Sequence, residues 1–254
     1  MKKNKVKVEF GEENKAKSRR RFIKLSGLTL AGSAVLYACS EDDDFIKGED
    51  PDPDPNPEVF DLGSGDVGIL NYAYALEQLE AAFYIEVLNG SYFSGAVDAE
   101  KEILTDLRNH EVIHREFFKT AITAAAGEEK TLPELEFDFS DAVDFSDRQS
   151  VLDTALLLED TGVSAYNGAG NLIQNPTYLL LAGKIVSVEA RHASAIADLL
   201  NPGSADFARD GILVDVGGSG VAYDKATPPS EVLSAVVGLN VVKTPFTANN
   251  LPTE

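Results

Sequence analysis

Apolar side chains recur every three or four residues along four long segments of this chain. In an α-helix such positions lie on one face, so the pattern predicts four amphipathic helices that each bury one stripe. Glycine, asparagine and proline, which favour turns, stand between the segments. The predicted helices span residues 66–88, 98–125, 148–169 and, after Asn175-Pro176, a stretch that ends before Pro202.

The three connections between these helices are short, long and short. Short connections join antiparallel neighbours, so we expect the first two helices to form one hairpin and the last two another. The middle connection, residues 128–146, can cover the length of a helix, because extended chain spans roughly 3.3 Å per residue. The second hairpin can therefore begin at the opposite end. This favours an all-α, four-helix crossover bundle over residues 64–200 instead of a simple up-down bundle.

The predicted inward stripes carry carboxylates, imidazoles and phenols as well as apolar groups. In each hairpin the first helix has a glutamate followed seven residues later by a tyrosine, and the second helix has a Glu-x-x-His motif. These motifs contain two of the three histidines in the chain. The repeated residues are Glu77, Tyr84, Glu111 and His114 in the first hairpin and Glu159, Tyr166, Glu189 and His192 in the second.

The two Glu-x-x-His motifs have the spacing of metal ligands. Residues three apart on a helix lie about 5–6 Å apart at Cβ, so one helix can offer a carboxylate and an imidazole to the same ions. Burying four carboxylates is costly unless they are protonated or matched by positive charge, and two divalent cations would match them. We therefore predict two divalent metal ions in the bundle core, held by Glu77, Glu111, His114, Glu159, Glu189 and His192.

Two alternatives to this ligand set stay open in the sequence. Glu80 also lies near the inward stripe and is an alternative to Glu77. Aligning the two hairpins puts Gly162 at the position of Glu80, which favours Glu77. The glutamates and histidines could instead form ordinary ion pairs with neighbours such as Arg115 or Arg191, although the apolar residues on the same stripes point these stripes toward the core.

Tyr84, Tyr166 and His110 are candidates for a layer of side chains around the ligands. The tyrosines lie two turns from their glutamates on the same face. There a phenol can be an ordinary core residue, hydrogen-bond a ligand carboxylate or take part in redox chemistry. His110 lies one turn before His114 and is either a satisfied interior histidine or an alternative ligand.

Residues 1–38 are typical of an export signal. Ser18-Arg19-Arg20-Arg21-Phe22-Ile23-Lys24 resembles a twin-arginine motif, and the apolar run at 25–37 is too short to span a bilayer. The run leads into Leu36-Tyr37-Ala38-Cys39, which resembles the lipobox of a bacterial lipoprotein. Cys39 is the only cysteine, which excludes a disulfide within the chain. We therefore expect an exported lipoprotein of the cell envelope, anchored to a membrane through Cys39.

Residues 39–63 and the net charge support a location outside the cytoplasm. An acidic run and the alternating prolines of 51–57 predict an extended tether. The acidic run also resembles a signal that directs some bacterial lipoproteins to the outer face of the outer membrane. Residues 1–38 hold ten of the 22 basic and three of the 42 acidic residues, so the rest of the chain is strongly negative. Nucleic acids would be repelled and cations attracted.

The repeated residues stand in four motifs along the chain. The motifs are, in order, Leu76-Glu77-Gln78-Leu79-Glu80-Ala81-Ala82-Phe83-Tyr84, His110-Glu111-x-x-His114, Glu159-Asp160-x-Gly162-Val163-x-Ala165-Tyr166 and Val188-Glu189-Ala190-Arg191-His192. They resemble the motifs of the ferritin-like domain family, which includes plant desiccation-related proteins and many bacterial envelope proteins. The resemblance covers residues 64–200 and implies a ferritin-like four-helix bundle with a di-iron or di-manganese centre at the six predicted ligands.

The resemblance specifies the metal-binding residues, but it does not specify one reaction. Our first hypothesis is an anchored oxidoreductase of peroxidase, catalase or oxidase type, with dioxygen or peroxide as its small oxidant. With one cysteine the chain cannot form a cysteine-ligated iron domain, so a redox-active centre would need an external electron donor. The alternative is a non-catalytic ferritin-like scaffold that scavenges metal or protects the cell surface under stress.

Residues 201–254 are expected to extend the bundle without adding chemistry. Residues 230–239 predict a short fifth helix, which could cover one end of the bundle. Gly217-Gly218-Ser219-Gly220 lacks the lysine and the helix of a phosphate-binding loop and predicts a flexible turn. This extension and a lipid anchor on every subunit argue against a closed storage cage. Assembly into a smaller homo-oligomer remains compatible with the sequence.

Overall fold

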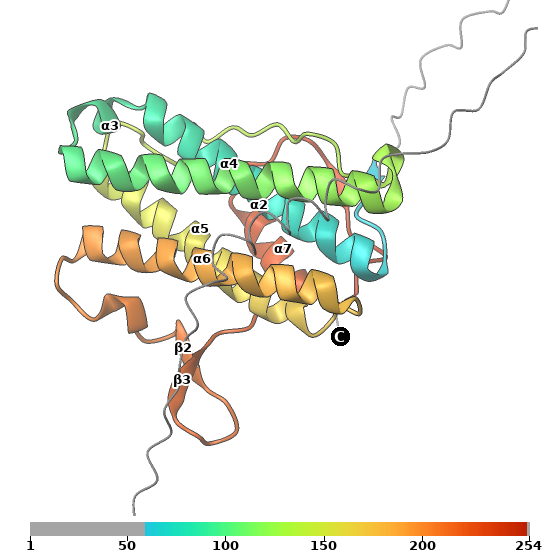
Figure 1. The fold of residues 1–254 in the computed structure, drawn as a ribbon. Helices are drawn as coiled ribbons and strands as arrows, with labels where there is room; N and C mark the ends of the chain where they lie inside the picture. Colours follow the sequence, from blue (N-terminus) through green and yellow to red (C-terminus); the bar gives the residue numbers. More distant parts are fainter. Residues whose placement is uncertain (1–58, 253–254) are drawn as a thin grey trace, which may run out of the picture. The chain divides into compact units, whose positions relative to one another are not determined.

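The computed structural model describes residues 59–252, so the predicted export signal, Cys39 and most of the tether lie outside the described part. Four long helices form two hairpins, α2 with α4 and α5 with α6, that pack into one bundle (Figure 1). The predicted all-α crossover bundle is confirmed. The four helices are α2 (Gly65–Asn89), α4 (Asp98–Ala126), α5 (Arg148–Gly170) and α6 (Pro176–Leu200).

Local capping explains where these helices begin and end. At the start of α5 the Asp147 side chain accepts a hydrogen bond from a backbone amide of the first turn. At the start of α6 the Asn175 side chain accepts a bond in the same way, and Pro176 is the first residue of the helix. Such caps satisfy amide groups that have no partner inside the helix. Gly127, at a φ of +97°, ends α4. A five-residue helix, α3 (Ser91–Gly95), follows α2 and was not predicted.

The long connection between α4 and α5 runs along the bundle, as expected for a crossover (Figure 1). It begins with the short 3-10 turn η1 (Glu128–Lys130). Two buried amide side chains on α2 hold it in place. Asn71 accepts from the Leu132 amide at 2.9 Å, and Gln78 accepts from the Leu135 amide at 2.8 Å. These bonds satisfy backbone groups that would otherwise be buried without partners.

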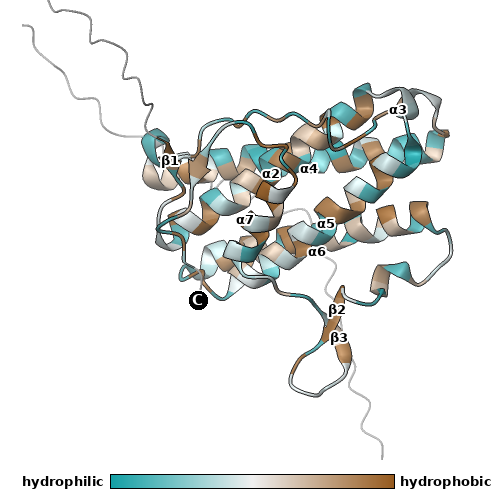
Figure 2. Cartoon of the chain, turned by 180° about the vertical axis from the view of Figure 1, so that it is seen from behind, coloured by the Kyte–Doolittle hydropathy of each residue, from teal (hydrophilic) through white to brown (hydrophobic). Residues whose placement is uncertain are grey.

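The C-terminal extension winds back over the bundle instead of forming a separate unit. In the view from behind, α7 lies against the bundle near α2 and α5 (Figure 2). The backbone of this extension bonds to the crossover, since the Asp138 amide donates to the Val241 carbonyl at 2.8 Å. The remaining elements are η2 (Asp206–Ala208), the antiparallel pair β2 (Leu213–Asp215) and β3 (Val221–Asp224), α7 (Pro229–Gly238), and β4 (Phe246–Thr247), which pairs in parallel with β1 (Phe60–Asp61).

The expectation that the fifth helix covers one end of the bundle is wrong. The structure has this helix, α7, but Val236 and Leu239 line the same space as Leu76 of α2 and Leu158 of α5, along the side of the bundle. The reason lies in α2, which is buried on nearly all its faces. Its apolar side chains are not confined to one stripe, so it needs cover on more than the side that faces the other helices. The crossover and α7 supply it.

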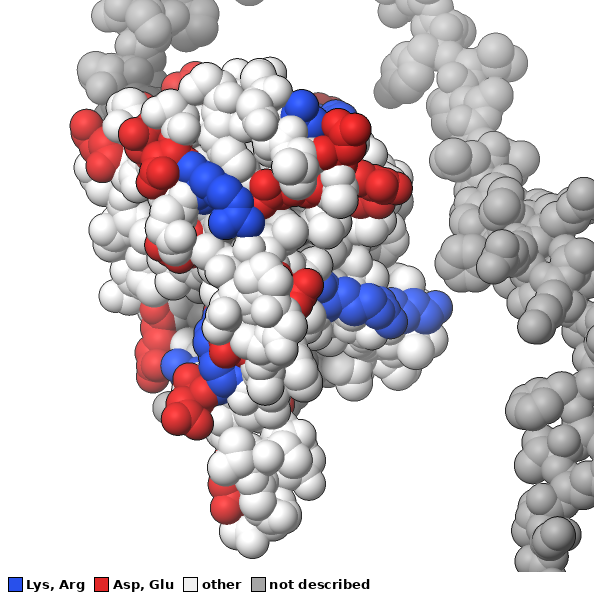
Figure 3. All heavy atoms as spheres, turned by 90° about the vertical axis from the view of Figure 1, so that its left-hand side faces the viewer, with Lys and Arg blue, Asp and Glu red and all other residues white. Residues whose placement is uncertain are grey.

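Charged side chains lie mainly on the outside of the bundle. Figure 3 shows acidic and basic side chains interspersed on one face of the described residues, without a continuous basic surface there. Within residues 59–252, none of the helices combines the length and the apolar character needed to cross a membrane.

Replacing Gly168 tests how tightly the extension is held. A Cβ at this position of α5 would lie 1.9 Å from the Thr227 carbonyl oxygen, so Gly168→Ala must push the chain outward. We expect a loss of about 1–3 kcal/mol in the free energy of unfolding, measured with urea. Gly183→Ala on α6, where a Cβ meets open space, is the control and should be neutral or stabilising. Equal stability of the two variants would contradict the packing described.

Candidate metal centre

The six predicted ligands converge in the bundle core. Glu77 comes from α2 and Glu159 from α5, while α4 and α6 each supply a glutamate and a histidine. All four glutamates are 0 % exposed, and His192 is 3 % exposed. The His114 side chain is 12 % exposed. The fold therefore gathers four acidic groups where water cannot solvate them.

His114 faces carboxylates from three helices. Its Nδ1 atom lies 2.9 Å from Glu189 Oε1 and 3.4 Å from Glu77 Oε2. Glu111, one turn away on the same helix, brings Oε2 to 3.5 Å from the same nitrogen. The imidazole nitrogen and three carboxylate oxygens thus point at one another.

His192 repeats this arrangement in the other hairpin. Its Nδ1 atom lies 2.8 Å from Glu111 Oε1 and 3.2 Å from Glu189 Oε2. Glu159 Oε2 lies 3.4 Å away, the same distance as its counterpart Glu77 from His114. Glu111 and Glu189 therefore each present one oxygen to each histidine.

These contacts define two overlapping groups of side chains that could hold a metal ion. In each group the ligand atoms all lie within 4.8 Å of one another. Carboxylate oxygen and imidazole nitrogen suit several divalent metals. The first group is Glu77, Glu111, His114 and Glu189, and the second is Glu111, Glu159, Glu189 and His192.

The alternative of ordinary ion pairs with neighbouring arginines is wrong for Arg115. Its guanidinium pairs with Glu116, at 2.7 Å, on the outer side of α4. Arg191 on α6 is exposed. The two imidazoles can balance at most two of the four buried carboxylates, so further positive charge or protons must balance the rest.

Without metal, protons held on the two histidines balance part of the negative charge. Burial alone would lower the pKa of His114, but hydrogen bonds to Glu111, Glu189 and Glu77 outweigh it and raise the pKa to about 12. Burial would likewise lower the pKa of His192, but its hydrogen bonds to Glu111, Glu159 and Glu189 raise it to about 12. Burial also opposes the ionisation of Glu111, yet its hydrogen bonds to both histidines lower its pKa to about 2. Glu111 thus stays ionised between two imidazolium groups.

The two single glutamates behave differently from Glu111. Burial raises the pKa of Glu159 to about 8, against a lowering effect of the hydrogen bond to His192. Burial also raises the pKa of Glu77 well above its usual range, and the nearby charges of Glu189 and Glu111 add to this rise. Both groups therefore hold protons that a bound cation would displace.

Tyr84 and Tyr166 hydrogen-bond to carboxylates across the bundle. The Tyr84 hydroxyl donates to Glu159 Oε1 at 2.6 Å, and the Tyr166 hydroxyl donates to Glu77 Oε1. Each tyrosine thus holds the glutamate of the other hairpin, with the second oxygen of that glutamate turned to a histidine. Burial and the adjacent carboxylate raise the pKa of both phenols well above the usual value, so they remain donors. The repeated spacing in the sequence indicated that the tyrosines lie near the ligands. That each one bonds the glutamate of the other hairpin depends on how the hairpins pack.

Glu80 belongs to neither group of ligands. It is 3 % exposed, and its Oε2 atom has no hydrogen-bond partner among the described residues. A Cβ on Gly162 would lie 2.9 Å from Glu80 Oε1, so the two positions that the hairpin alignment equates face each other. The structure thus brings Glu77, and not Glu80, to the histidines.

His110 is exposed, so the expectation of an interior histidine is wrong. Its Nδ1 atom lies 2.9 Å from Nε2 of His192, and the two rings are stacked. His110 therefore contacts the nitrogen of His192 that faces away from the carboxylates. Such a contact fixes the orientation of a ligand ring.

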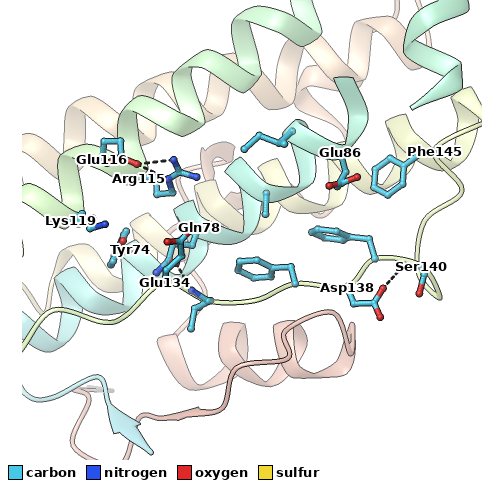
Figure 4. Close-up of a pocket in the computed structure, with 15 residues that line it drawn as sticks. Tyr74, Gln78, Glu86, Arg115, Glu116, Lys119, Glu134, Asp138, Ser140 and Phe145 are labelled. Carbon is cyan, nitrogen blue, oxygen red and sulfur yellow. Dashed lines mark hydrogen bonds and ion pairs between the residues drawn. The ribbon is translucent and has the colours of Figure 1, made fainter. Parts of the chain in front are cut away.

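A larger cleft lies away from these ligands, between α2, α4 and the crossover (Figure 4). Its volume is about 530 Å³, and its lining includes Tyr74, Lys119 and Asp138. Gln78 and Arg115 also line it, and they directly follow Glu77 and His114 in the chain. The cleft and the carboxylate cluster therefore lie on different sides of the same helical turns.

Comparison with known protein families matches residues 65–202 to the ferritin-like domain. No curated protein matches the chain. The matched segment contains all four long helices and all six predicted ligands.

The metal-free protein should lose stability as the pH rises. His114 and His192 have pKa values of about 12 in the folded protein, against an ordinary value of 6.5 for histidine, so the stability from their protonation is complete below about pH 6.5 and is lost toward pH 12. Glu159, raised to about 8, adds a loss between about pH 4.5 and pH 8. We expect the free energy of unfolding to fall from about pH 5 to pH 9 in urea titrations. Metal-saturated protein is the control, and a flat profile without metal would contradict this.

Removing one tyrosine hydroxyl should weaken metal binding. Tyr166→Phe leaves Glu77 Oε1 without its donor, and loss of such a partner typically lowers metal affinity about 10–100-fold. Competition with a chelator measures the change. Tyr72→Phe is a matched control, because the buried Tyr72 hydroxyl has no partner among the described residues. Equal affinities in both variants would show that the Tyr166 bond does not support the ligand.

Proposed function

The chain belongs to the ferritin-like domain family, and we propose that it is an envelope member whose core binds two divalent metal ions for oxidoreductase chemistry on dioxygen or peroxide. The observation that carries this proposal is the sharing of Glu111 and Glu189 between the two ligand groups. Each group adds one glutamate and one histidine of its own, which is the pattern expected for two adjacent ions bridged by carboxylates.

Charge supports two ions instead of one. Four fully buried glutamates carry four negative charges when ionised, and two divalent cations match them without protons. Iron and manganese suit this mixture of carboxylate and imidazole donors, and family membership favours them. When bound, the ions would supply Lewis acidity and electrons.

The protein's own residues would orient the ligands and keep water away. Tyr84 and Tyr166 each fix one oxygen of a single glutamate, and His110 steadies the His192 ring. The large cleft does not include the ligands in its lining, so a small oxidant suits this centre better than a bulky substrate. Electrons for repeated turnover would come from an external donor.

The envelope location rests on the sequence before the described residues. The twin-arginine motif, the apolar run and Cys39 stand in the order of a lipoprotein signal. Twin-arginine export carries folded proteins, which would let the metals bind before secretion. Anchoring through Cys39 would then hold the bundle at the outer membrane, where it could face the cell surface. The part of the predicted 39–63 tether that precedes the described residues would link the two.

Metal content of the purified protein tests the proposal. We expect two iron or manganese ions per chain, and we expect Glu111→Ala combined with His192→Ala to abolish binding of the pair, because the first group then loses the shared Glu111 and the second loses both Glu111 and His192. Glu102→Ala, at an exposed position of α4, is the control and should bind like the wild type. Less than about one ion per chain, unchanged in the double variant, would refute the metal centre.

Turnover separates the oxidoreductase from a metal-scavenging or stress-protective scaffold. Metal-loaded protein should consume hydrogen peroxide, or show a transient absorbance when it is reduced and then exposed to oxygen. If metal is bound and both assays are silent, the scaffold is the correct function.

A further inference from the structure

One position breaks the symmetry between the two hairpins. Glu77 and Glu159 match, as do Tyr84 and Tyr166, but Glu80 has a glycine, Gly162, as its counterpart. In the structure the Glu80 carboxyl lies where a side chain on residue 162 would be, 2.9 Å from the Cβ position. The missing side chain of Gly162 therefore gives room to a fifth buried carboxyl group.

The surroundings of Glu80 contain a small space instead of a partner. A cavity of about 40 Å³ is lined by Glu80, Gly162 and residues of α7 such as Val236. A cavity above roughly 10–15 Å³ can hold a water-sized molecule. Glu80 is 3 % exposed, its Oε2 lacks a hydrogen-bond partner among the described residues, and the rest of the lining is mainly apolar. A buried polar atom beside an open space is a place for a small polar guest.

The cavity lies beside the ligand layer, and none of the six ligands is in its lining. Glu80 and Gly162, which do line it, each stand about one helical turn after a ligand, Glu77 and Glu159. The cavity lining includes Leu157, which is 51 % exposed, so the cavity reaches the outside beside α7. Both histidines come from α4 and α6, whereas Glu80 and Gly162 come from α2 and α5. Burial raises the pKa of Glu80 and the charges of Glu111 and Glu189 raise it further, so Glu80 lies within electrostatic reach of the cluster.

We propose that the space between Glu80, Gly162 and α7 is the route by which dioxygen or hydrogen peroxide reaches the metal centre, and that the Glu80 carboxyl hydrogen-bonds peroxide there. This inference rests on the proposed function. Two divalent ions balance the four ligand glutamates and leave Glu80 uncompensated, so the group stays a neutral acid that can donate a hydrogen bond. Dioxygen accepts hydrogen bonds poorly, so it uses the route without a hydrogen bond from Glu80.

The route is tested by xenon in crystals of the metal-loaded protein, since xenon occupies small apolar cavities. We expect xenon density between α2, α5 and α7. Val236→Phe should remove this density and slow the reactions with both oxidants, because Val236 lines the cavity and is 5 % exposed. Val237→Phe is the matched control on the same helix, since Val237 is 74 % exposed. Absence of xenon from the wild type would overturn the route.

The role of Glu80 is tested by two substitutions of similar size. Glu80→Met removes the hydrogen bond and should lower the rate constant for peroxide roughly tenfold, as loss of a bond of about 1.4 kcal/mol predicts. Glu80→Gln, whose amide still donates, should stay within about threefold of the wild type. Glu86→Gln, at an exposed position of α2, is the control. The reaction with dioxygen should not change in either Glu80 variant.

The wild type separates the failure of this inference from that of the proposed function. Wild-type protein that holds metal and consumes neither oxidant refutes the function, and the inference falls with it. Active wild type with equal peroxide rates in Glu80→Met, at equal metal content, overturns the role of Glu80 alone. A merely structural role for Glu80 would slow both oxidants in Glu80→Met, or lower its metal content, which also contradicts the proposal.

Discussion

The structure depends on how four ionisable glutamates, all fully buried, are neutralised in one layer of the bundle. Two imidazoles lie against them, with Nδ1 to oxygen distances from 2.8 Å to 3.5 Å. Two imidazolium groups cannot balance four carboxylates, so the metal-free core retains protons on Glu77 and Glu159. Folding, proton uptake and cation binding are therefore linked in this protein. A cation that enters the layer replaces protons and removes the electrostatic penalty at once.

The same polar layer joins the two hairpins. Tyr84 reaches from the first hairpin to Glu159 in the second, and Tyr166 reaches back to Glu77. Glu111 and Glu189 each contact histidines of both hairpins. A change at one ligand is thus felt in both halves of the bundle. Residues in such a network do not contribute additively, so single and double substitutions in this layer should couple.

Segments outside the four helices form the walls of the cavities near the centre. The crossover and α7 cover α2, which is buried on nearly all its faces. Close packing of α7 leaves a space of about 40 Å³ beside Glu80, while the crossover borders a separate cleft of about 530 Å³. The C-terminal extension therefore packs against α2 and also borders the space beside the buried Glu80 carboxyl group.

Much of the fold could be predicted from the sequence, because helix periodicity, capping residues and connection lengths are local properties. They placed α2, α4, α5 and α6 within about one residue of their observed bounds, and the repeated Glu, Tyr and Glu-x-x-His positions indicated the six side chains that meet. Long-range packing decided the rest. The tertiary structure alone decided that each tyrosine bonds the glutamate of the other hairpin and that His110 is exposed. It also decided that α7 lies along the side of the bundle and that Gly162 lies against Glu80. These contacts join residues tens of positions apart, and their energies depend on burial and distance in three dimensions, which no spacing along the chain encodes.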